Sequence, residues 1–216
     1  LLVAADIKRP AAVEQLRAAG HRVYACDCSR GDLLARNGQP GTAAAELRYD
    51  GYCRERALDH TAARALRVEL PAGMERFDDL RLGPQAQEPQ AQCGDLLLRD
   101  RQGNWTYQFC VVVDDRDQAV DLIIRGMDLL ESTGRQLLLT RMLGRTQSPR
   151  VLHHPLLLQS GGAKLSKANR DTSVRELRMR GVTSAAILGT ALHQLGLHGG
   201  WPLSLREALN LFSSPV

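Results

Sequence analysis

The spacing of apolar residues predicts an amphipathic helix near the beginning of the chain. Val13 and Leu16 lie on one face of the segment Ala11–Ala19, with polar residues between them. Gly20 follows directly, and helices commonly end at a glycine because glycine accepts a positive φ. This segment is therefore expected to be the end of a helix, which a parallel-sheet architecture would accommodate.

Continuous apolar runs in the second half of the chain predict strands. One run covers 109–113 and ends in Asp114 and Asp115, and another covers 122–124. Uninterrupted apolar residues are typical of strands that are buried on both faces of a parallel sheet. The two aspartates are interpreted as strand-end and helix-capping residues, outside any catalytic site.

Helix-like segments alternate with these runs. The clearest one extends from Ser132 to Leu143, where Ser132 or Thr133 can cap the first turn. A third apolar run covers 155–158, and two further helices are expected over 184–195 and 205–212. Alternating strands and helices indicate an α/β fold.

The composition is that of an ordinary globular protein. Hydrophobic residues make up 44% and charged residues 24% of the 216 residues, which excludes disordered and fibrous classes. The length allows one large domain, or one domain with a small insert. The apolar opening of the chain is too short for a signal peptide or a membrane span, so we expect a cytoplasmic protein.

Positive charge is concentrated in one stretch. Ten Lys or Arg residues lie between Arg135 and Arg180, against only Asp171 and Glu176, although the net charge of the chain is +4. Such a stretch favours an anionic partner such as tRNA or ATP, while a solvated basic face is the alternative on charge alone.

Lys164-Leu165-Ser166-Lys167 follows a glycine pair and an apolar run. A loop there is expected at the carboxyl edge of a sheet, where open α/β folds bind ligands. Two ammonium groups and a hydroxyl can hold a polyphosphate and neutralise the charge that develops on leaving pyrophosphate. The tetrapeptide by itself is also compatible with a solvated basic turn.

The cysteines indicate a metal site. Five cysteines cannot all pair in disulfides, and Cys26, Cys28 and Cys53 lie close together in the sequence. Thiolates at such spacing can converge on zinc. On spacing alone His60 or His21 is the natural fourth ligand, because a tyrosine with a pKa of about 10 must lose its proton to the metal. Free buried thiols are the other possibility.

Several motifs occur in a characteristic order. They are Trp105–Gln108, Val111–Asp115, Arg125–Leu130, Ser132–Gln136 and the Lys-Leu-Ser-Lys loop. Together they resemble the glutamyl-tRNA synthetase family of class I synthetases, above all its short branch, the glutamyl-queuosine tRNA(Asp) synthetases. The resemblance extends from about residue 11 to residue 167.

This resemblance implies a class I Rossmann-type catalytic domain, incomplete at its N-terminus, with a zinc-binding insertion and a short helical C-terminal region. The implied parts are the end of the first Rossmann half (1–20), a zinc-binding subdomain (21–60), a connecting insertion (61–104), the second Rossmann half (105–170) and the helical region (171–216).

The family's functional positions also carry over. They imply that Tyr107 and Arg125 hold glutamate, and that Lys164, Ser166 and Lys167 bind ATP, with Lys167 acting in catalysis. The short branch implies Cys26, Cys28, Tyr49 and Cys53 as ligands of a structural zinc ion, with Tyr49 and Cys53 on one helix face. Mg²⁺ is expected to accompany ATP, tRNA is the expected partner, and we expect a monomer.

The sequence departs from the family in two respects. The amino-terminal His-Ile-Gly-His-type signature is absent, and His153-His154 lies in the wrong order to replace it. Because the chain also begins at Leu1, we expect a fragment that alone is inactive or very weak. Gly134 stands where the family usually has proline, which predicts a local loop change.

Two rival functions stay open at this stage. One is an ordinary glutamyl-tRNA synthetase truncated at both ends, which the short C-terminal region after Lys167 and the Tyr49 pattern disfavour. The other is a noncatalytic zinc module that binds RNA through its basic surface.

Overall fold

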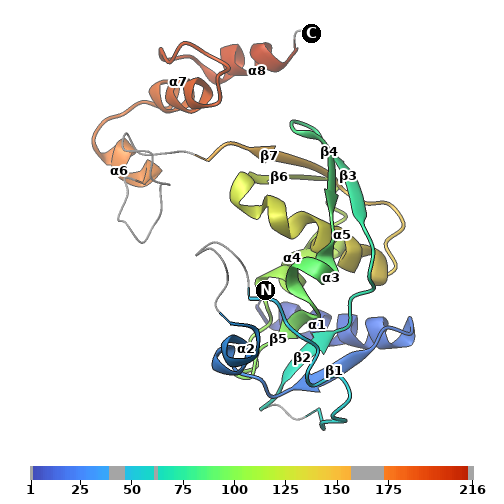
Figure 1. Cartoon of the computed structure of the whole chain (residues 1–216). Coiled ribbons are helices and arrows are strands. Elements are labelled where there is room, and N and C mark those ends of the chain that lie inside the picture. The colour runs from blue at the N-terminus through green and yellow to red at the C-terminus, as the bar shows by residue number, and fades with distance from the viewer. Residues whose placement is uncertain (1, 39–46, 61–62, 157–172, 214–216) are drawn as a thin grey trace. The chain divides into compact units, whose positions relative to one another are not determined.

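The computed structural model describes residues 2–38, 47–60, 63–156 and 173–213 (Figure 1). Two compact units are present, the first comprising Leu1–Ile124 and Leu129–Leu152, the second Arg125–Asp128 and His153–Val216. The elements of the first part are α1 (Leu2–Ala18), β1 (Val23–Cys26), α2 (Arg30–Asn37), β2 (Ala65–Val68), β3 (Glu75–Asp79), β4 (Gly83–Gln87), α3 (Pro89–Cys93) and β5 (Leu96–Arg99). They are followed by α4 (Tyr107–Asp117), β6 (Leu122–Gly126), the 3₁₀ helix η1 (Met127–Ser132), α5 (Thr133–Met142), β7 (Arg150–His154), α6 (Val174–Met179), α7 (Ser184–Gln194) and α8 (Leu205–Ser213). The chain is therefore an α/β protein, as predicted.

Strands β1, β2 and β5 form a three-stranded sheet in that order, with antiparallel neighbours. All residues of β1 are buried, but successive side chains point to opposite faces of a strand. Val23 accordingly belongs to the main apolar core, whereas Tyr24 and Cys26 belong to a second cluster with Tyr49 and Cys53. The sheet thus separates the core from the cysteine group.

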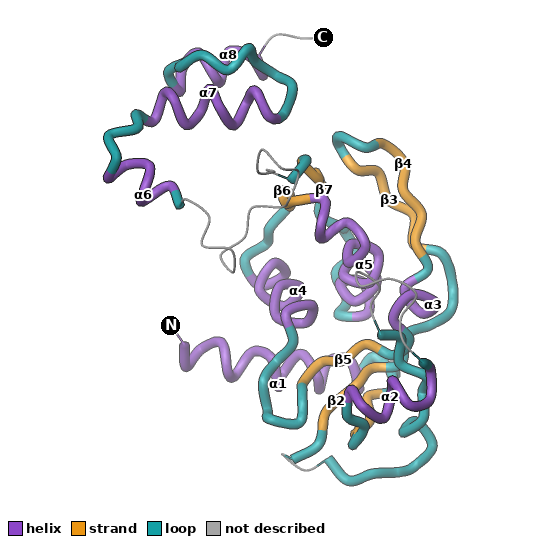
Figure 2. Tube along the Cα trace, turned by 60° about the vertical axis from the view of Figure 1, so that its left-hand side comes forward, coloured by secondary structure: helices purple, strands orange, loops and turns teal. Residues whose placement is uncertain are grey.

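The main core of the first unit lies between this sheet and the helices α1, α4 and α5, whose courses can be followed in Figure 2. The predicted first helix is confirmed, because α1 ends at Ala18 and Gly20 has a φ of +82°. The largest fully buried side chains of the main core are those of Leu16, Val68, Leu98, Phe109, Val113 and Leu139.

The predicted strand at 109–113 is wrong, because these residues form the middle of helix α4. Phe109, Val112 and Val113 are its buried residues, and their spacing is that of one helix face. A short apolar run does not by itself distinguish a strand from a buried helix segment, and packing against the core decided the outcome.

The interpretation of Asp114 and Asp115 as strand-end and capping residues is also wrong, because it depended on that strand. Both lie inside α4, which ends at Asp117. Asp114 instead accepts two hydrogen bonds from Nη2 of Arg9, at 2.9 and 3.1 Å, and so ties α4 to α1.

The second sheet has the order β4-β3-β7-β6. β3 pairs antiparallel with β4, and parallel with β7 through Asp79 and Val151. The predicted strand at 122–124 is confirmed as β6, but it is not fully buried, since Ile124 is 60% exposed. The third predicted strand is displaced: β7 ends at His154, residues 155–156 are irregular, and 157–158 lie outside the described residues.

Helix α5 confirms the prediction for 132–143, although its start differs in detail. Ser132 makes no capping hydrogen bond with its side chain; its Oγ accepts one from Nε2 of Gln108 at 2.9 Å. Gly134 lies in the first turn of α5 and not in a loop, and its N–H donates to Oε1 of Gln87 at 2.8 Å. A proline at position 134 would lack this donor, so the departure from the family comes with a specific contact to Gln87.

The helices predicted near the C-terminus are confirmed as α7 and α8 in the second unit. Leu192 of α7 packs with Leu203 and with Ala208 of α8. Among the described helices, none has both the length and the apolar character that crossing a membrane requires.

Candidate metal centre and ligase site

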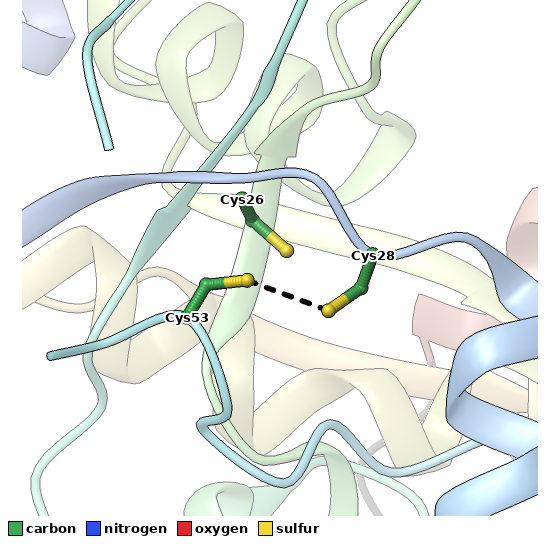
Figure 3. A group of neighbouring side chains, drawn as sticks. All are labelled: Cys26, Cys28 and Cys53. Carbon is green, nitrogen blue, oxygen red and sulfur yellow. Dashed lines mark hydrogen bonds between the residues drawn. The ribbon is translucent and has the colours of Figure 1, made fainter. Parts of the chain in front are cut away.

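Three of the four predicted zinc ligands lie side by side. The ligand atoms of Cys26, Cys28 and Cys53 are all within 4.8 Å of one another, and Figure 3 shows their sulfur atoms directed toward a common point. The Sγ atoms of Cys28 and Cys53 are 3.4 Å apart. Two thiolates at about 2.3 Å from one tetrahedral zinc lie about 3.8 Å from each other, so this arrangement fits the metal.

Tyr49, the fourth predicted ligand, lies next to Cys26 and Cys53. Its side chain is buried, and its hydroxyl accepts a hydrogen bond from the backbone N–H of Cys53 at 2.9 Å. The same hydroxyl lies 3.5 Å from Sγ of Cys26. The alternative fourth ligands, His21 and His60, do not join the metal-binding group in the described part of the chain.

Local structure explains how each cysteine reaches the group. Cys26 is the last residue of β1. Ser29 caps α2 through reciprocal hydrogen bonds with Asp32, which fixes the start of this helix directly after Cys28. Cys53 lies in a turn, not on a helix as predicted, and the N–H of Arg54 closes that turn on the carbonyl of Gly51 at 2.9 Å.

Gly94 fixes the backbone of Tyr49. It has a φ of +69°, and a Cβ atom at this position would lie 1.9 Å from the carbonyl oxygen of Tyr49. The N–H of Tyr49 also donates to the carbonyl of Cys93 at 2.9 Å. The link between α3 and β5 therefore restrains the backbone of Tyr49 through Cys93 and Gly94.

Burial and neighbouring charges set the protonation of the donors. Burial raises the pKa of the Cys28 thiol to about 12, opposed by a hydrogen bond from Arg36. Burial also acts against the Cys26 thiolate, but contact with the Tyr49 hydroxyl and the charge of Arg67 outweigh it and lower the pKa of Cys26. Burial raises the pKa of Tyr49 far above its ordinary value, so a cation next to its oxygen is needed to stabilise the phenolate. The donor set can hold a metal ion.

A buried carboxylate supports this region, and no pattern in the sequence marks it. Asp95 accepts from Nε and Nη2 of Arg54 at 2.9 and 2.8 Å, and its side chain is fully buried. Tyr24 of β1 donates a short hydrogen bond to the same carboxylate. Burial and this carboxylate raise the pKa of Tyr24, so its hydroxyl remains a donor. The network joins β1, the Cys53 turn and the start of β5.

A cavity of about 410 Å³ opens beside the cysteine group in the first unit. Its walls include Cys28, Arg67 and Asp95, and also Thr106 and Gln108, the two neighbours of Tyr107. The metal-binding group and the beginning of α4 therefore border one hollow.

The predicted glutamate ligands lie in different units. Tyr107 is the first residue of α4 in the first unit, and its side chain is 52% exposed. Arg125 belongs to the second unit, where its Nε donates to Nε2 of His153 at 3.0 Å. Their meeting in one crevice stays a prediction. Lys164, Ser166 and Lys167 lie outside the described residues.

From the sequence, His153 is excluded from a nucleotide-binding signature and has no other assigned role. The structure places it, fully buried, against the guanidinium of Arg125. Its position in the last strand, 28 residues from Arg125 in sequence, gave no clue to this contact. The hydrogen bond donated by Nε fixes the plane of the guanidinium, as the predicted binding of a carboxylate through two parallel donors would require.

The family model for class I tRNA synthetases (E and Q), catalytic domain, matches residues 9–207. The chain belongs to this family. The predicted membership of the class I glutamyl-type synthetases is thereby confirmed.

Several curated relatives are glutamyl-Q tRNA(Asp) synthetases. That of Geobacter sulfurreducens is 39% identical over 186 residues, which cover 86% of this chain and 59% of the relative. That of Bordetella bronchiseptica is 47% identical over 150 residues, 68% of this chain and 46% of the relative. The chain thus spans about half the length of the curated relatives it matches, between 46% and 59% for these two.

A solved structure shares the fold. The crystal structure of glutamate–tRNA synthetase from Elizabethkingia anophelis superposes with a TM-score of 0.58 at 22% identity, covering 77% of this chain and 36% of that chain. The predicted fold class, an α/β catalytic domain of class I synthetase type, is confirmed by this likeness and by the family match.

Proposed function

We propose that this chain is part of an ATP-dependent ligase that activates glutamate as glutamyl-adenylate and transfers the glutamyl group to queuosine in the anticodon of tRNA(Asp). The observation that carries the proposal is the family match over residues 9–207, together with 39–47% identity to glutamyl-Q tRNA(Asp) synthetases. The three cysteines around Tyr49 support the same assignment, because this is the ligand pattern expected for that branch.

In the first step, a carboxylate oxygen of glutamate attacks the α-phosphorus of ATP, and the bond to the bridging oxygen breaks as pyrophosphate leaves. Arg125 is assigned to a carboxylate of glutamate, since a guanidinium offers two parallel donors to it. The buried His153 orients that guanidinium. The exposed Tyr107 is assigned to a hydrogen bond with the amino acid.

In the second step, a hydroxyl oxygen of the tRNA attacks the carbonyl carbon of the mixed anhydride, and AMP leaves.

The ATP phosphates of the first step are assigned to Lys164, Ser166 and Lys167. Lys167 offsets the negative charge on the departing pyrophosphate in that step. Mg²⁺ is expected to accompany ATP. The enzyme acts chiefly by placement and charge stabilisation.

Cys26, Cys28, Tyr49 and Cys53 would hold a structural zinc ion. These four side chains would anchor the segment between β1 and β2 when a metal ion is bound, and no catalytic step is assigned to that ion. Tyr24, Asp95 and Arg54 hold the same segment from the sheet side through their own hydrogen bonds.

The test is glutamyl transfer to two RNAs. The 216-residue chain, and the whole gene product where the gene encodes more, is incubated with ATP, radiolabelled glutamate and either queuosine-containing tRNA(Asp) or tRNA(Glu). We expect labelling of tRNA(Asp) only, at a position removed with the anticodon stem-loop. Labelling at the 3′ end of tRNA(Glu) would instead establish an ordinary glutamyl-tRNA synthetase.

Arg125→Lys and Lys167→Ala separate a ligase from a noncatalytic RNA-binding module. Both are expected to abolish glutamate-dependent ATP–pyrophosphate exchange by the whole gene product and to leave tRNA binding unchanged. Nucleotide affinity that is insensitive to Lys167→Ala would favour the binding module.

A further inference from the structure

Arg67 is a buried cation without a carboxylate partner in the described part of the chain. It lies on β2 and is only 8% exposed. Its Nη1 donates to the backbone carbonyl of Asp95 at 2.9 Å, whereas the carboxylate of Asp95 is engaged by Arg54. Its Nε is buried and has no hydrogen-bond acceptor among the described residues. A buried charge is costly unless an opposite charge lies close to it.

The nearest anionic group that the protein can form is the metal-binding set. The guanidinium of Arg67 stacks on the ring of Tyr49, with Cζ 3.8 Å from the ring centroid. On the paired strands β1 and β2, Tyr24 lies opposite Arg67 and Cys26 lies opposite Ala65, which places Arg67 and Cys26 on the same face of the sheet. Arg67 therefore contacts one predicted donor and shares a sheet face with a second.

The negative charge of the metal-bound donor set favours a cation such as the Arg67 guanidinium beside it. Three thiolates and one phenolate carry four negative charges, twice the charge of one Zn²⁺ ion, so the filled centre keeps an excess of negative charge. Two other arginines lie at its edge: Arg36 Nη2 is 3.3 Å from Sγ of Cys28, and Arg56 Nη1 is 3.6 Å from Sγ of Cys53. Each of these also forms an ion pair with an aspartate, Asp50 and Asp27 respectively. Arg67 is the arginine of the three whose charge no carboxylate offsets within the described residues.

We propose that Arg67 is the positioning residue and counter-cation of the metal centre, holding Tyr49 by stacking on its ring and offsetting the negative charge of the zinc-bound donors. This inference rests on the zinc centre of the proposed function. It adds a role for a residue outside the ligand set, and it accounts for a buried guanidinium that otherwise has no charge partner in the described structure.

The test measures zinc affinity by competition with a chromophoric chelator, on the 216-residue chain and its variants. Arg67→Met removes the charge but keeps a long apolar side chain, and we expect its zinc affinity to fall about 10- to 100-fold, the usual effect of losing a supporting residue around a metal. Arg67→Lys keeps the charge and should recover most of that loss. Arg22→Met, which removes a surface arginine paired with Glu55, is the matched control and should bind zinc as the unchanged chain does.

A second background separates a charge effect from a packing effect. Tyr49→Phe keeps the aromatic ring beneath Arg67 but removes the oxygen. If Arg67 acts on the charged donors, Arg67→Met should cost less affinity in the Tyr49→Phe chain than alone, because coupled residues are non-additive. Equal losses in both backgrounds would reduce Arg67 to a packing role and overturn the proposal.

Cobalt provides a readout independent of affinity. Co²⁺ bound in place of zinc should show the absorption of a tetrahedral thiolate site, and Arg67→Met should shift its bands when the circular dichroism spectrum of the chain is unchanged. Failure of the unchanged chain to bind Zn²⁺ or Co²⁺ would remove the metal centre itself, whereas tight binding that is indifferent to Arg67→Met would refute only the role of Arg67.

Discussion

Single residues with the same backbone conformation have very different importance in this molecule. Gly94 and Gly103 both have a positive φ, +69° and +88°. A side chain at Gly103 would meet open space, whereas one at Gly94 would collide with the backbone of Tyr49. Of these two glycines, Gly94 alone combines an unusual conformation with close contact to a predicted metal ligand.

Replacement of these two glycines should separate the two effects. Gly103→Ala is expected to lower the free energy of unfolding by about 1–3 kcal/mol through backbone strain alone. Gly94→Ala should add a further loss of about 1–3 kcal/mol from the collision, and should also reduce the zinc content. Urea unfolding and zinc content of the purified chains check this. Equal destabilisation by both would show that the Tyr49 contact is not constraining.

Asp50 makes α2 sensitive to acid. Nε of Arg36 on α2 donates to Asp50 at 2.5 Å, and this contact holds the pKa of Asp50 below its ordinary value of 3.8. A carboxylate with a depressed folded pKa contributes stability above its ordinary pKa, and the contribution is lost as the pH falls through the folded pKa. The pair therefore stabilises the protein at neutral pH and not in strong acid.

Asp50→Asn should accordingly lower the free energy of unfolding by about 0.5–1 kcal/mol at pH 7, the range of a partly exposed ion pair. The difference from the unchanged chain should shrink as the pH falls below 3.8 and disappear only below the depressed pKa of Asp50 in the folded chain. Asp121→Asn is the control, since Asp121 is 87% exposed and its contact with Arg150 is 3.8 Å long. Thermal melts between neutral and acid pH measure both, and a loss for Asp50→Asn that is the same at every pH would contradict the assignment.

At the scale of elements, sequence periodicity predicted the helices better than the strands. α1, α5, α7 and α8 all have apolar faces with helical spacing and were predicted. The run at 109–113 was mistaken for a strand because β-branched valines favour strands locally. In the folded chain, contact of Phe109 and Val113 with the main core overrides that preference.

In the candidate site, too, local sequence predicts nearby groups of residues better than contacts between distant segments. The grouping of Cys26, Cys28 and Cys53 could be predicted because they lie within 28 residues of one another, and Tyr49 was added to the predicted donors because the family suggested it. The contacts of Arg67 with Tyr49 and of Arg125 with His153 join different strands and segments, and nothing in their local sequence marks them. Such partners depend on strand pairing, which a single sequence does not determine.

Helix α4 has one structural and one accessible face, which two aromatic substitutions can distinguish. Phe109 is fully buried, so Phe109→Ala should lower the free energy of unfolding by about 3–5 kcal/mol. Tyr107 is 52% exposed on the same helix, and Tyr107→Ala should change the free energy of unfolding by only about 0.5 kcal/mol. Urea denaturation followed by circular dichroism decides the matter. A large loss for Tyr107→Ala would assign this residue to the core and weaken its role as a glutamate ligand.

At the scale of the whole molecule, part of the basic stretch is displayed on the second unit. Arg175, Arg178 and Arg180 are all exposed on or next to α6. For a protein proposed to bind tRNA, exposed arginines contribute to affinity by releasing counterions from phosphates.

Replacing these three arginines with glutamine should weaken tRNA binding and flatten its salt dependence. If all three contact phosphates, the slope of log affinity against log salt should decrease by about 2–3, since each contact contributes about 0.7–0.9. Filter binding at several salt concentrations measures the slope. A control with the same change in charge replaces three exposed arginines of the first unit: Arg76, Arg81 and Arg150. Identical slopes for the two triple variants would exclude a specific tRNA surface on α6.

The double-sided burial of β1 restricts how this protein can change during evolution. Val23 contributes to the main core, and its neighbour Tyr24 and the thiol of Cys26 lie in the other cluster. Insertion or deletion of one residue within β1 would carry a thiol into the core and a valine toward the metal ligands, because side chains alternate along a strand. Between Val23 and Cys53, length variation among relatives is therefore expected in the connection between α2 and Tyr49, while the distance from Val23 to Cys28 stays constant.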